Sequence, residues 1–438
     1  MAKTRNLDDR FLEDIVKLID SNNLNFLIGS GFSADTLKTL GNLEKVMEII
    51  KKEPANLKYR LLESLLYWHF FEISVYPMVR EISINKLSKN IEFINIWKQI
   101  ITKRENPNFQ KQLNIFTTNY DVVLEYSMEN SFADYNDGFA GRINPYFTTA
   151  NYNKVYYKQA LFSNRRSELP IFNLFKLHGS ITWKKTDKYE DKFAYGDYIE
   201  ELEKFYDEYK HLIYNADTEN GERYNPIFTG IDKCKWDKIT KVFIDTLIEH
   251  LEITPEELED KWIPFIDEYK TIFKIVNPTK EKFSDTLVDK NYYELLRIYC
   301  NELERENALL FVYGFSFNDE HIEDITKRAL NNPSLIMIIF AFTNKEKIRF
   351  IDKFAVNNNV WVIGLAEWDT ESIEGGVVIV RNDGNADMPE QEATTGEVDV
   401  IEQVAITIET IDPTQTIAEP KMDINILNTF FGKLIQKV

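Results

Sequence analysis

The sequence is poor in cysteine, and this shortage limits the kinds of site that the chain can build. Only two of its 438 residues are cysteine, Cys234 and Cys300, and no CxxC pair is present. One chain therefore lacks the four thiols of a cysteine-only zinc site and the paired spacing of a disulfide framework. We expect two reduced thiols, no metal site, no zinc and a cytoplasmic location.

Positive charge and long apolar runs are also scarce. The chain has 52 Lys and Arg against 71 Asp and Glu, a formal net charge of -19. Binding to a phosphate backbone needs clustered Lys and Arg, so we expect no direct nucleic-acid binding. No run of about 18 apolar residues is present, so no membrane segment is expected. The charged, amphipathic first 19 residues lack the apolar stretch of a signal peptide.

What the sequence does contain is a series of short apolar runs that read as buried strands. They occupy residues 24–28, 112–117, 170–177, 308–317, 334–342 and 360–365. In the C-terminal third of the main domain, strands alternate with helical segments of about a dozen residues, which predicts a parallel sheet with helices on both faces. We therefore expect an α/β, Rossmann-like fold. In such sheets ligands bind at the carboxyl edge, and polar clusters follow five of the predicted strands.

The predicted domain organisation has one main unit and one appended segment. We assign residues 1–370 to the main domain, with large, mainly helical insertions at about 37–112 and 185–272. Residues 371–438 form an acidic extension, because no Lys or Arg occurs between Arg381 and Lys421. The extension is expected to be small and β-rich, to end in an amphipathic helix and to serve assembly or partner contact, although a solvated tail fits its composition equally well.

The segment FLIGSGFS places two glycines directly after an apolar run. Gly29 and Gly31 allow a sharp turn and a close approach of the backbone to a ligand. If a helix follows, its free N–H groups favour a phosphate. The third glycine of the standard dinucleotide fingerprint is missing, so the segment alone fits a tight turn as well as a phosphate loop.

Two further clusters carry groups suited to chemistry. FTTNYD places Thr118, Asn119 and Asp121 at a strand end, where an amide and a carboxylate can hold a ligand or orient water; an Asn/Asp turn that caps a helix is the alternative. His178 follows another apolar run and precedes a glycine, so its ring is expected at the open edge of the sheet. Imidazole titrates near neutral pH and suits proton transfer, although a lone histidine is more often structural.

The ordered set GSGFS, TTNYD, KLHGS and GFSFND, followed by TN after a strand, resembles the sirtuin family. It is most similar to the bacterial sirtuin-like (SIR2-like) branch found in anti-phage defence systems. The resemblance covers roughly residues 9–366 and rests on the order of the motifs and their placement at strand ends rather than on any single motif.

The resemblance implies an NAD site built from these five clusters. The residues that it assigns to NAD binding are Gly29, Ser30, Gly31, Ser33, Thr118, Asp121, Gly314, Ser316 and Asn344. In the family the glycine loop holds the pyrophosphate, and the last asparagine lies on the adenosine side. Asn119 and His178 match the family's catalytic asparagine and histidine. Which of the two activates the water stays open.

Two departures from the family pattern affect the expected reaction. The Pro-Asp-Phe-Arg segment of the deacylases is replaced by residues 40–43, and the zinc ribbon is missing. Both weaken a protein deacylase. The resemblance then implies an NAD⁺ glycohydrolase (NADase) that releases nicotinamide and ADP-ribose and depletes NAD⁺ in abortive infection. The alternatives are a non-catalytic scaffold or regulatory subunit that binds NAD or ADP-ribose and, less favoured, an NAD-dependent deacylase.

The resemblance also implies partners. Stand-alone sirtuin-like chains of this size form homo-oligomers and pair with a hexameric ATPase of the HerA family. We therefore expect a homo-oligomer that is held inactive until such a partner triggers it.

Overall fold

The computed structural model of this chain describes residues 2–37, 42–78, 84–185, 193–195, 198–213, 226–235, 238–273, 290–365 and 421–437. Its centre is an eight-stranded sheet with the strand order β1-β14-β13-β12-β2-β3-β9-β4, in which all neighbours are parallel. The strands are β1 (Lys3–Arg5), β2 (Asn23–Ile28), β3 (Gln112–Thr117), β4 (Tyr135–Asn136), β9 (Ile171–Lys176), β12 (Ala308–Tyr313), β13 (Ile336–Phe340) and β14 (Val360–Ile363). The predicted Rossmann-like α/β class is confirmed.

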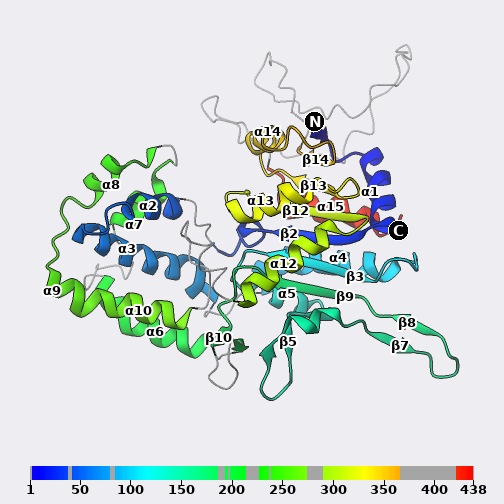
Figure 1. Cartoon of the computed structure of the whole chain (residues 1–438), viewed down its shortest axis with the longest axis horizontal. Helices are drawn as coiled ribbons and strands as arrows, with labels where there is room; N and C mark the ends of the chain where they lie inside the picture. The colour runs from blue at the N-terminus through cyan, green and yellow to red at the C-terminus, as the bar shows by residue number, and fades with distance from the viewer. Residues whose placement is uncertain are drawn as a thin grey trace, which may run out of the picture.

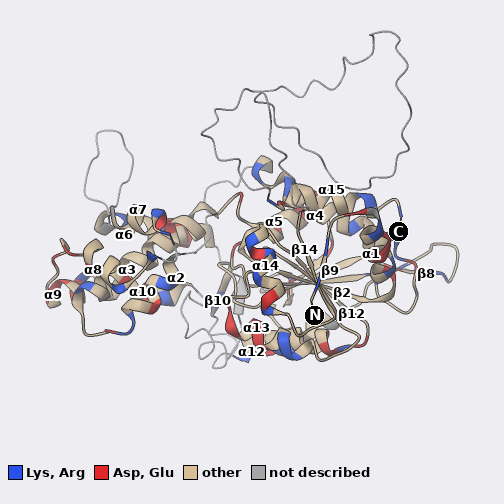
Figure 2. Ribbon diagram, turned by 90° about the horizontal axis from the view of Figure 1, so that it is seen from above, with Lys and Arg blue, Asp and Glu red and all other residues tan. Residues whose placement is uncertain are grey.

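The sheet is buried on both faces, which explains why its central strands are nearly continuous apolar runs. Along β2, Phe26 and Ile28 belong to one core cluster and Leu27 to the other, because successive side chains point to opposite faces. The helices of one face are α1 (Asp9–Ser21), α4 (Ile84–Lys103), α5 (Val123–Asn130) and α15 (Ile424–Leu434). Those of the other face are α12 (Lys290–Glu304), α13 (Glu320–Ala329) and α14 (Asn344–Lys353). Figure 2 shows α4, α5 and α15 on one side of the strands and α12 and α13 on the other.

Side-chain caps fix where several of these helices begin. An oxygen of the capping residue accepts a hydrogen bond from a backbone N–H of the first turn, which would otherwise have no partner within the helix. The capping residues are Asp8 for α1, Asp319 for α13, Thr343 for α14 and Asp423 for α15. Two of the caps, Asp319 and Thr343, end the short loops that follow β12 and β13 at the carboxyl edge.

The two predicted insertions meet in a helical lobe beside the sheet, on the left of Figure 1. The lobe contains α2 (Asn42–Ile50), α3 (Leu57–Phe70), α6 (Tyr198–Ile213), α7 (Pro226–Lys233), α8 (Lys241–Leu247), α9 (Pro255–Glu257) and α10 (Ile263–Ile272), with the shorter turns η2 (Phe71–Val75), η3 (Tyr76–Met78) and η6 (Leu258–Trp262). Helix α2 packs on α3, α7 and α8, and α3 packs on α10. Helix α4, by contrast, comes from the first insertion but covers the sheet.

Short strands complete the fold near β9. A four-stranded sheet has the order β10-β11-β6-β5, and β7 pairs with β8 in a hairpin that projects from the body in Figure 1. Their bounds are β5 (Phe139–Ala140), β6 (Tyr146–Phe147), β7 (Tyr157–Gln159), β8 (Arg166–Glu168), β10 (Trp183–Lys185) and β11 (Phe193–Tyr195), with one 3₁₀ segment, η4 (Thr149–Asn153), between β6 and β7. Within the ranges given above, no helix has the length and apolar content needed to cross a membrane.

The predicted C-terminal helix is present as α15, and it packs against the main domain. Phe430 stacks on Phe11 of α1 with ring centroids 5.4 Å apart, and Phe431 is fully buried. Asn428 Nδ2 donates to the Lys89 carbonyl of α4 at 2.9 Å. The helix is thus part of the main hydrophobic core. The β-rich part of the predicted extension, including the boundary near residue 370, lies outside the described residues.

Candidate functional site

The five polar clusters follow β2, β3, β9, β12 and β13, which are consecutive in the sheet. Because all five strands are parallel, their carboxyl ends lie at one edge, and the clusters meet there. The strand order reverses between β2 and β12: β3 and β9 lie on one side, and β13 and β14 on the other. A reversal of this kind opens a crevice at the carboxyl edge, which is where ligands bind in open α/β sheets.

The glycines of the predicted phosphate loop bring two loops into backbone contact across this reversal. Gly29 N donates to the Tyr313 carbonyl at 3.1 Å, and Gly31 N donates to the Gly314 carbonyl at 3.0 Å. A Cβ on Gly31 would lie 2.6 Å from the Gly314 Cα. Gly314 has a φ of +65°, a conformation that L side chains rarely adopt. These glycines are therefore required by the contact between the loops after β2 and β12.

The condition that a helix follows the glycine loop directly is not met. The loop continues as η1 (Ser30–Phe32), a single 3₁₀ turn, and the next helix in the described residues is α2. A three-residue turn has no helix dipole of consequence, because the dipole sums over aligned peptide units. The helix-terminus argument for phosphate binding therefore does not apply to this loop, and any phosphate would be held by the turn and its side chains.

Asn119, Ser33 and Asp121 form one buried hydrogen-bond network. Asn119 Nδ2 donates to the Gly29 carbonyl at 3.1 Å and to Ser33 Oγ at 3.2 Å, and Ser33 Oγ donates to Asp121 Oδ2 at 2.9 Å. Asp121 Oδ1 also accepts from Val123 N at 3.0 Å, at the start of α5. Asp121 therefore forms an Asx turn at the start of α5 with one oxygen and holds Ser33 with the other, and its ligand-holding role stays a prediction.

A buried ion pair lies next to this network and contacts its backbone. Lys176, the last residue of β9, lies 2.9 Å from Glu125 of α5 and is 2% exposed. Its Nζ also donates to the backbone carbonyls of Asn119, at 3.3 Å, and Asp121. Burial raises the pKa of the Glu125 carboxyl, and the nearby ammonium opposes this shift. Lys176 therefore fixes the backbone that carries Asn119.

His178 lies at the carboxyl edge as predicted, and a carboxylate holds its ring. The imidazole Nε2 is 3.0 Å from Asp319 Oδ2, and both side chains are less than a tenth exposed. The other oxygen of Asp319 accepts from His321 N and Ile322 N at the start of α13. In hydrolases a buried carboxylate orients the ring of the general-base histidine through Nδ1; here the carboxylate faces Nε2, so Nδ1 is the nitrogen turned away from it.

The remaining predicted site residues lie at the same edge of the sheet, outside the two hydrogen-bond networks described above. Ser30 is exposed in the η1 turn, and Thr118 is half-buried. The Ser316 carbonyl accepts from Arg349 Nη2 at 3.0 Å, which links the loop after β12 to α14. Asn344 is the first residue of α14, next to the cap.

Sequence reasoning missed three residues that organise the site: Asp319, Lys176 and Glu125. Asp319 stands in the GFSFND motif directly before a helical pattern, which is the signal of a helix cap. A lysine at the end of the apolar run 170–177 was the available sign for Lys176. Glu125 gave no sign, because a glutamate in a helix is normally solvated.

Within the parts of the chain that the structure describes, no group of three or more His, Cys, Asp or Glu side chains is arranged to hold a metal ion.

A comparison with protein families finds that the SIR2-like domain model matches residues 113–232. The match begins in β3 and includes Asn119, Asp121, Lys176 and His178, and it ends in α7. A search of curated proteins finds no match. The match supports a sirtuin-like domain and, because SIR2-like domains use NAD⁺, an NAD-related activity in general.

Proposed function

We propose that this protein is an NAD⁺ glycohydrolase that cleaves the bond between nicotinamide and ribose. The observation that carries the proposal is the placement of Asn119 and His178 at the ends of the neighbouring strands β3 and β9, next to the strand-order reversal. Both side chains are more than nine-tenths buried, and each is held by named neighbours. The SIR2-like match over this region supports NAD⁺ as the substrate.

The reaction is a substitution at the ribose C1′ carbon. The N-glycosidic bond breaks, and its electron pair neutralises the pyridinium nitrogen, so nicotinamide leaves as a neutral molecule. The oxygen of water bonds to C1′, and the proton that the water loses passes to a base and then to solvent. The products are ADP-ribose, nicotinamide and one proton. Because the leaving group is already activated, the protein needs mainly to orient the substrate and the water.

The hydrogen bonds suggest how the two candidate residues divide the work. Both contacts of the Asn119 side chain use Nδ2, which leaves Oδ1 to accept from a water or a ribose hydroxyl. His178, with its ring held by Asp319, is placed to accept the proton or to anchor the ribose. A positioned general base contributes a rate factor of roughly 10²–10⁴.

The test is NAD⁺ consumption by the purified full-length chain and by His178→Ala and Asn119→Ala. Each variant is expected to lose most of the activity. Matched controls are His211→Ala and Asn130→Ala, because both residues are exposed on helices and are expected to be neutral. If both site variants consumed NAD⁺ at the wild-type rate, the proposed mechanism would be wrong.

The products separate this proposal from its two alternatives. A glycohydrolase yields ADP-ribose whether or not an acetyl-lysine peptide is present. A deacylase yields O-acetyl-ADP-ribose only with the peptide, and a binding scaffold yields nothing. The orientation of His178 by a carboxylate favours an enzyme, because a scaffold has no need of an oriented base.

We further propose that the activity depletes NAD⁺ in anti-phage defence, and that a homo-oligomer of this chain is gated by a hexameric ATPase of the HerA family. Support comes from the motif order and from the need to restrain an NADase in its own cell. The assay repeated with such an ATPase added should show a partner-dependent rate. A rate that is high alone and unchanged by the ATPase would contradict the gating but leave the hydrolase proposal intact.

A further inference from the structure

The hairpin formed by β7 and β8 is exposed along nearly its whole length. Its two strands pair from Tyr157 and Glu168 at the base to Gln159 and Arg166 near the tip. Every residue from 156 to 167 is exposed, so both faces of the ribbon are open. Figure 1 shows the hairpin standing clear of the body. A two-stranded hairpin is marginally stable in water unless another element packs on it, so we expect a partner surface to cover this one.

The tip of the hairpin presents two large apolar side chains to solvent. Leu161 is 92% exposed, and Phe162 is 99% exposed. Tyr156 and Tyr157, at the base of the ribbon, are about half-exposed. Single exposed apolar residues are ordinary on a protein surface, but a group of them on one projecting element marks an interaction site. The hairpin therefore offers an apolar contact to a partner.

The hairpin and the residues before it are also basic, in a chain that is otherwise acidic. Residues 138–167 contain five Lys and Arg and no Asp or Glu, which leaves 47 Lys and Arg against 71 Asp and Glu in the rest of the chain. The five are Arg142, Lys154, Lys158, Arg165 and Arg166. All five are exposed, and none of their side chains makes an ion pair within the part of the chain that the structure describes.

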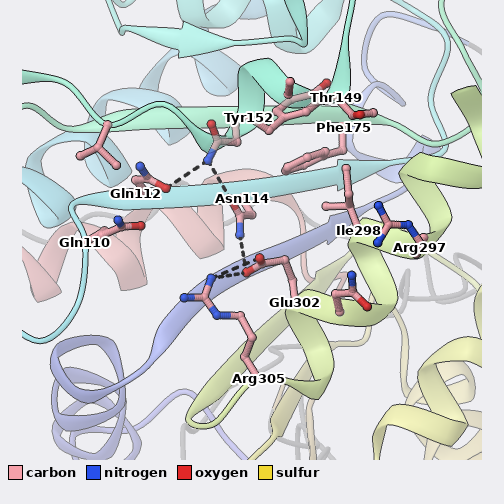
Figure 3. A pocket seen from close by; sticks show the side chains of 14 residues that line it. Gln110, Gln112, Asn114, Thr149, Tyr152, Phe175, Arg297, Ile298, Glu302 and Arg305 are labelled. Carbon is pink, nitrogen blue, oxygen red and sulfur yellow. Dashed lines mark hydrogen bonds and ion pairs between the residues drawn. The ribbon is translucent and has the colours of Figure 1, made fainter.

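The arginines of α12 differ from these five because they are paired within the chain. Arg297 lies 2.6 Å from Glu294, and Arg305 lies 2.9 Å from Glu302. Figure 3 shows the guanidinium of Arg305 turned toward Glu302. Pairing of this kind leaves little charge for another molecule. The unpaired bases of the hairpin instead fit a partner surface that is acidic and has room for an apolar tip.

A second surface of the same chain has this complementary chemistry. A cavity of about 570 Å³ lies at the amino edge of the main sheet, where Asn22 and Asn307 precede β2 and β12. Its apolar lining residues are Leu18, Phe109, Pro333 and Ile336. Asp20 and Glu306 are exposed, and each is next to a lining residue in the sequence. The volume is in the range of small-molecule sites, so it is ample for two side chains.

We propose that two copies of this chain pair through their amino edges, with the hairpin of each copy in the cavity of the other. Leu161 and Phe162 occupy the apolar cavity, while Arg165 and Arg166 face the acidic residues beside it. Residues 169–170 join the hairpin to the amino end of β9, so hairpin and cavity lie toward the same edge of the sheet. A contact that each copy both gives and receives is the isologous arrangement of two-fold dimers.

This contact is an interface of the homo-oligomer proposed above, and it rests on that proposal. A nucleic acid or an anionic membrane would also attract the five bases. A phosphate backbone, however, has no cavity for an apolar tip, and neither partner gives the cavity at the amino edge an occupant. Pairing of two copies accounts for the apolar tip, the unpaired bases and the cavity together.

The first test is sedimentation velocity of the full-length chain over a series of concentrations. Leu161→Ser with Phe162→Ser should weaken self-association at least about tenfold, because apolar side chains that fill a pocket carry much of the affinity of an interface. Val356→Ser is the matched control, since Val356 is also 92% exposed but lies outside both the hairpin and the cavity lining. It should leave self-association unchanged.

A charge swap tests the assignment of the acceptor surface. Arg165→Glu with Arg166→Glu should weaken self-association, and Asp20→Lys with Glu306→Lys should do the same. All four changes in one chain should restore it, because both sides of the contact then have reversed sign. Every substituted side chain is exposed, so the fold should be kept, and thermal melting checks this.

The possible failures can be told apart. A wild-type chain that stays monomeric at every concentration would overturn both the homo-oligomer and this interface. An oligomeric wild type whose hairpin variants associate equally well would overturn the interface alone. The interface is also overturned if the hairpin variants associate normally but lose binding to phosphatidylglycerol vesicles or to duplex DNA, since the partner is then an anionic surface. None of these measurements uses NAD⁺, so the hydrolase proposal is tested separately.

Discussion

The imidazole Nε2 of His178 lies 3.0 Å from Oδ2 of Asp319, although the two residues follow strands that are not neighbours. His178 comes after β9 and Asp319 after β12, and the sheet places β2 and β3 between them. Strands are about 4.8 Å apart, so the contact crosses roughly 14 Å of sheet edge. The pair therefore closes over the ends of the strands that carry the glycine loop and Asn119.

Asp319→Asn should separate the two roles of this carboxylate. Asparagine caps helices as well as aspartate does, so α13 and the free energy of unfolding should change little. The charge that orients His178 is lost, so kcat for NAD⁺ should fall at least ~10-fold while KM changes little. Kinetics and thermal unfolding on the same samples measure both. An unchanged kcat would show that the charge of Asp319 does not act through His178.

Gly31→Ala should destabilise the protein, because its Cβ would lie 2.6 Å from the backbone of Gly314. A displacement of packed backbone costs about 1–3 kcal/mol. Gly432→Ala is a matched control: it lies inside α15 with nothing within 4 Å of its Cβ, and it should stabilise by ~0.5–1 kcal/mol. Chemical denaturation gives both values. Opposite signs are expected, and equal effects would contradict the loop contact.

Replacing one partner of the buried Lys176–Glu125 pair should lower the free energy of unfolding more, relative to the loss in the double variant, than additivity of the two changes allows. Lys176→Met leaves Glu125 buried without its partner, which typically costs ~3–5 kcal/mol. The double variant Lys176→Met with Glu125→Gln should lose less than the sum of the two single changes. A denaturant titration of the four proteins measures the coupling. Strict additivity would mean that the pair contributes nothing.

Glu125 should also make stability depend on pH. Burial raises the pKa of its carboxyl above the ordinary 4.5, so the folded state keeps a proton that the unfolded chain has lost. The unfolding free energy contributed by this group is therefore present at low pH and declines as pH rises from about 4.5 through the raised pKa. Denaturation of wild type and Glu125→Gln across that range should show a flatter slope for the variant. Parallel slopes would contradict the shifted pKa.

Phe431→Ala should destabilise the main domain although it lies seven residues from the end of the chain. The ring is fully buried against the sheet-covering core, and truncating such a residue costs ~3–5 kcal/mol. Thr429→Ala, on the exposed side of the same helix, should stay within about 0.5 kcal/mol of wild type. Thermal melts compare the two. Similar melts would show that α15 is an independent appendage.

The main strands could be predicted because a strand that is buried on both faces consists almost entirely of apolar residues. Each of these apolar runs is bounded by polar residues, which mark where the strand ends. The runs at 24–28 and 360–365 correspond to β2 and β14. Strand β1, with the sequence KTR, was not predicted, because a short edge strand needs no apolar pattern and pairs with β14 only through tertiary contact. The joining of the two helical insertions in one lobe likewise depends on contacts that no local pattern contains.

The position of the candidate site could be predicted from the sequence. The residues that hold Asn119 and His178 in place could not. Parallel strands bring their carboxyl ends together, so strand-end motifs containing Asn119 and His178 had to meet at one edge. The contact of His178 with Asp319 depends on the strand order, which periodicity does not specify. The hydrogen bonds of Asn114 with Asn25 and Asn173 could not be foreseen either, because a lone Asn173 within an apolar run gives no sign of its neighbours on β2 and β3.

The strand order also has a consequence for synthesis. The glycine loop ends at residue 33, but the backbone that fills the space above its glycines, at Gly314, is made almost 300 residues later. At about 5–20 residues per second, the ribosome needs roughly 15–60 seconds to reach it. A nascent chain, or one truncated before β12, therefore has neither the loop contact nor Asp319. Under the proposed function, the cell would meet no active NADase until the ribosome has passed Asp319.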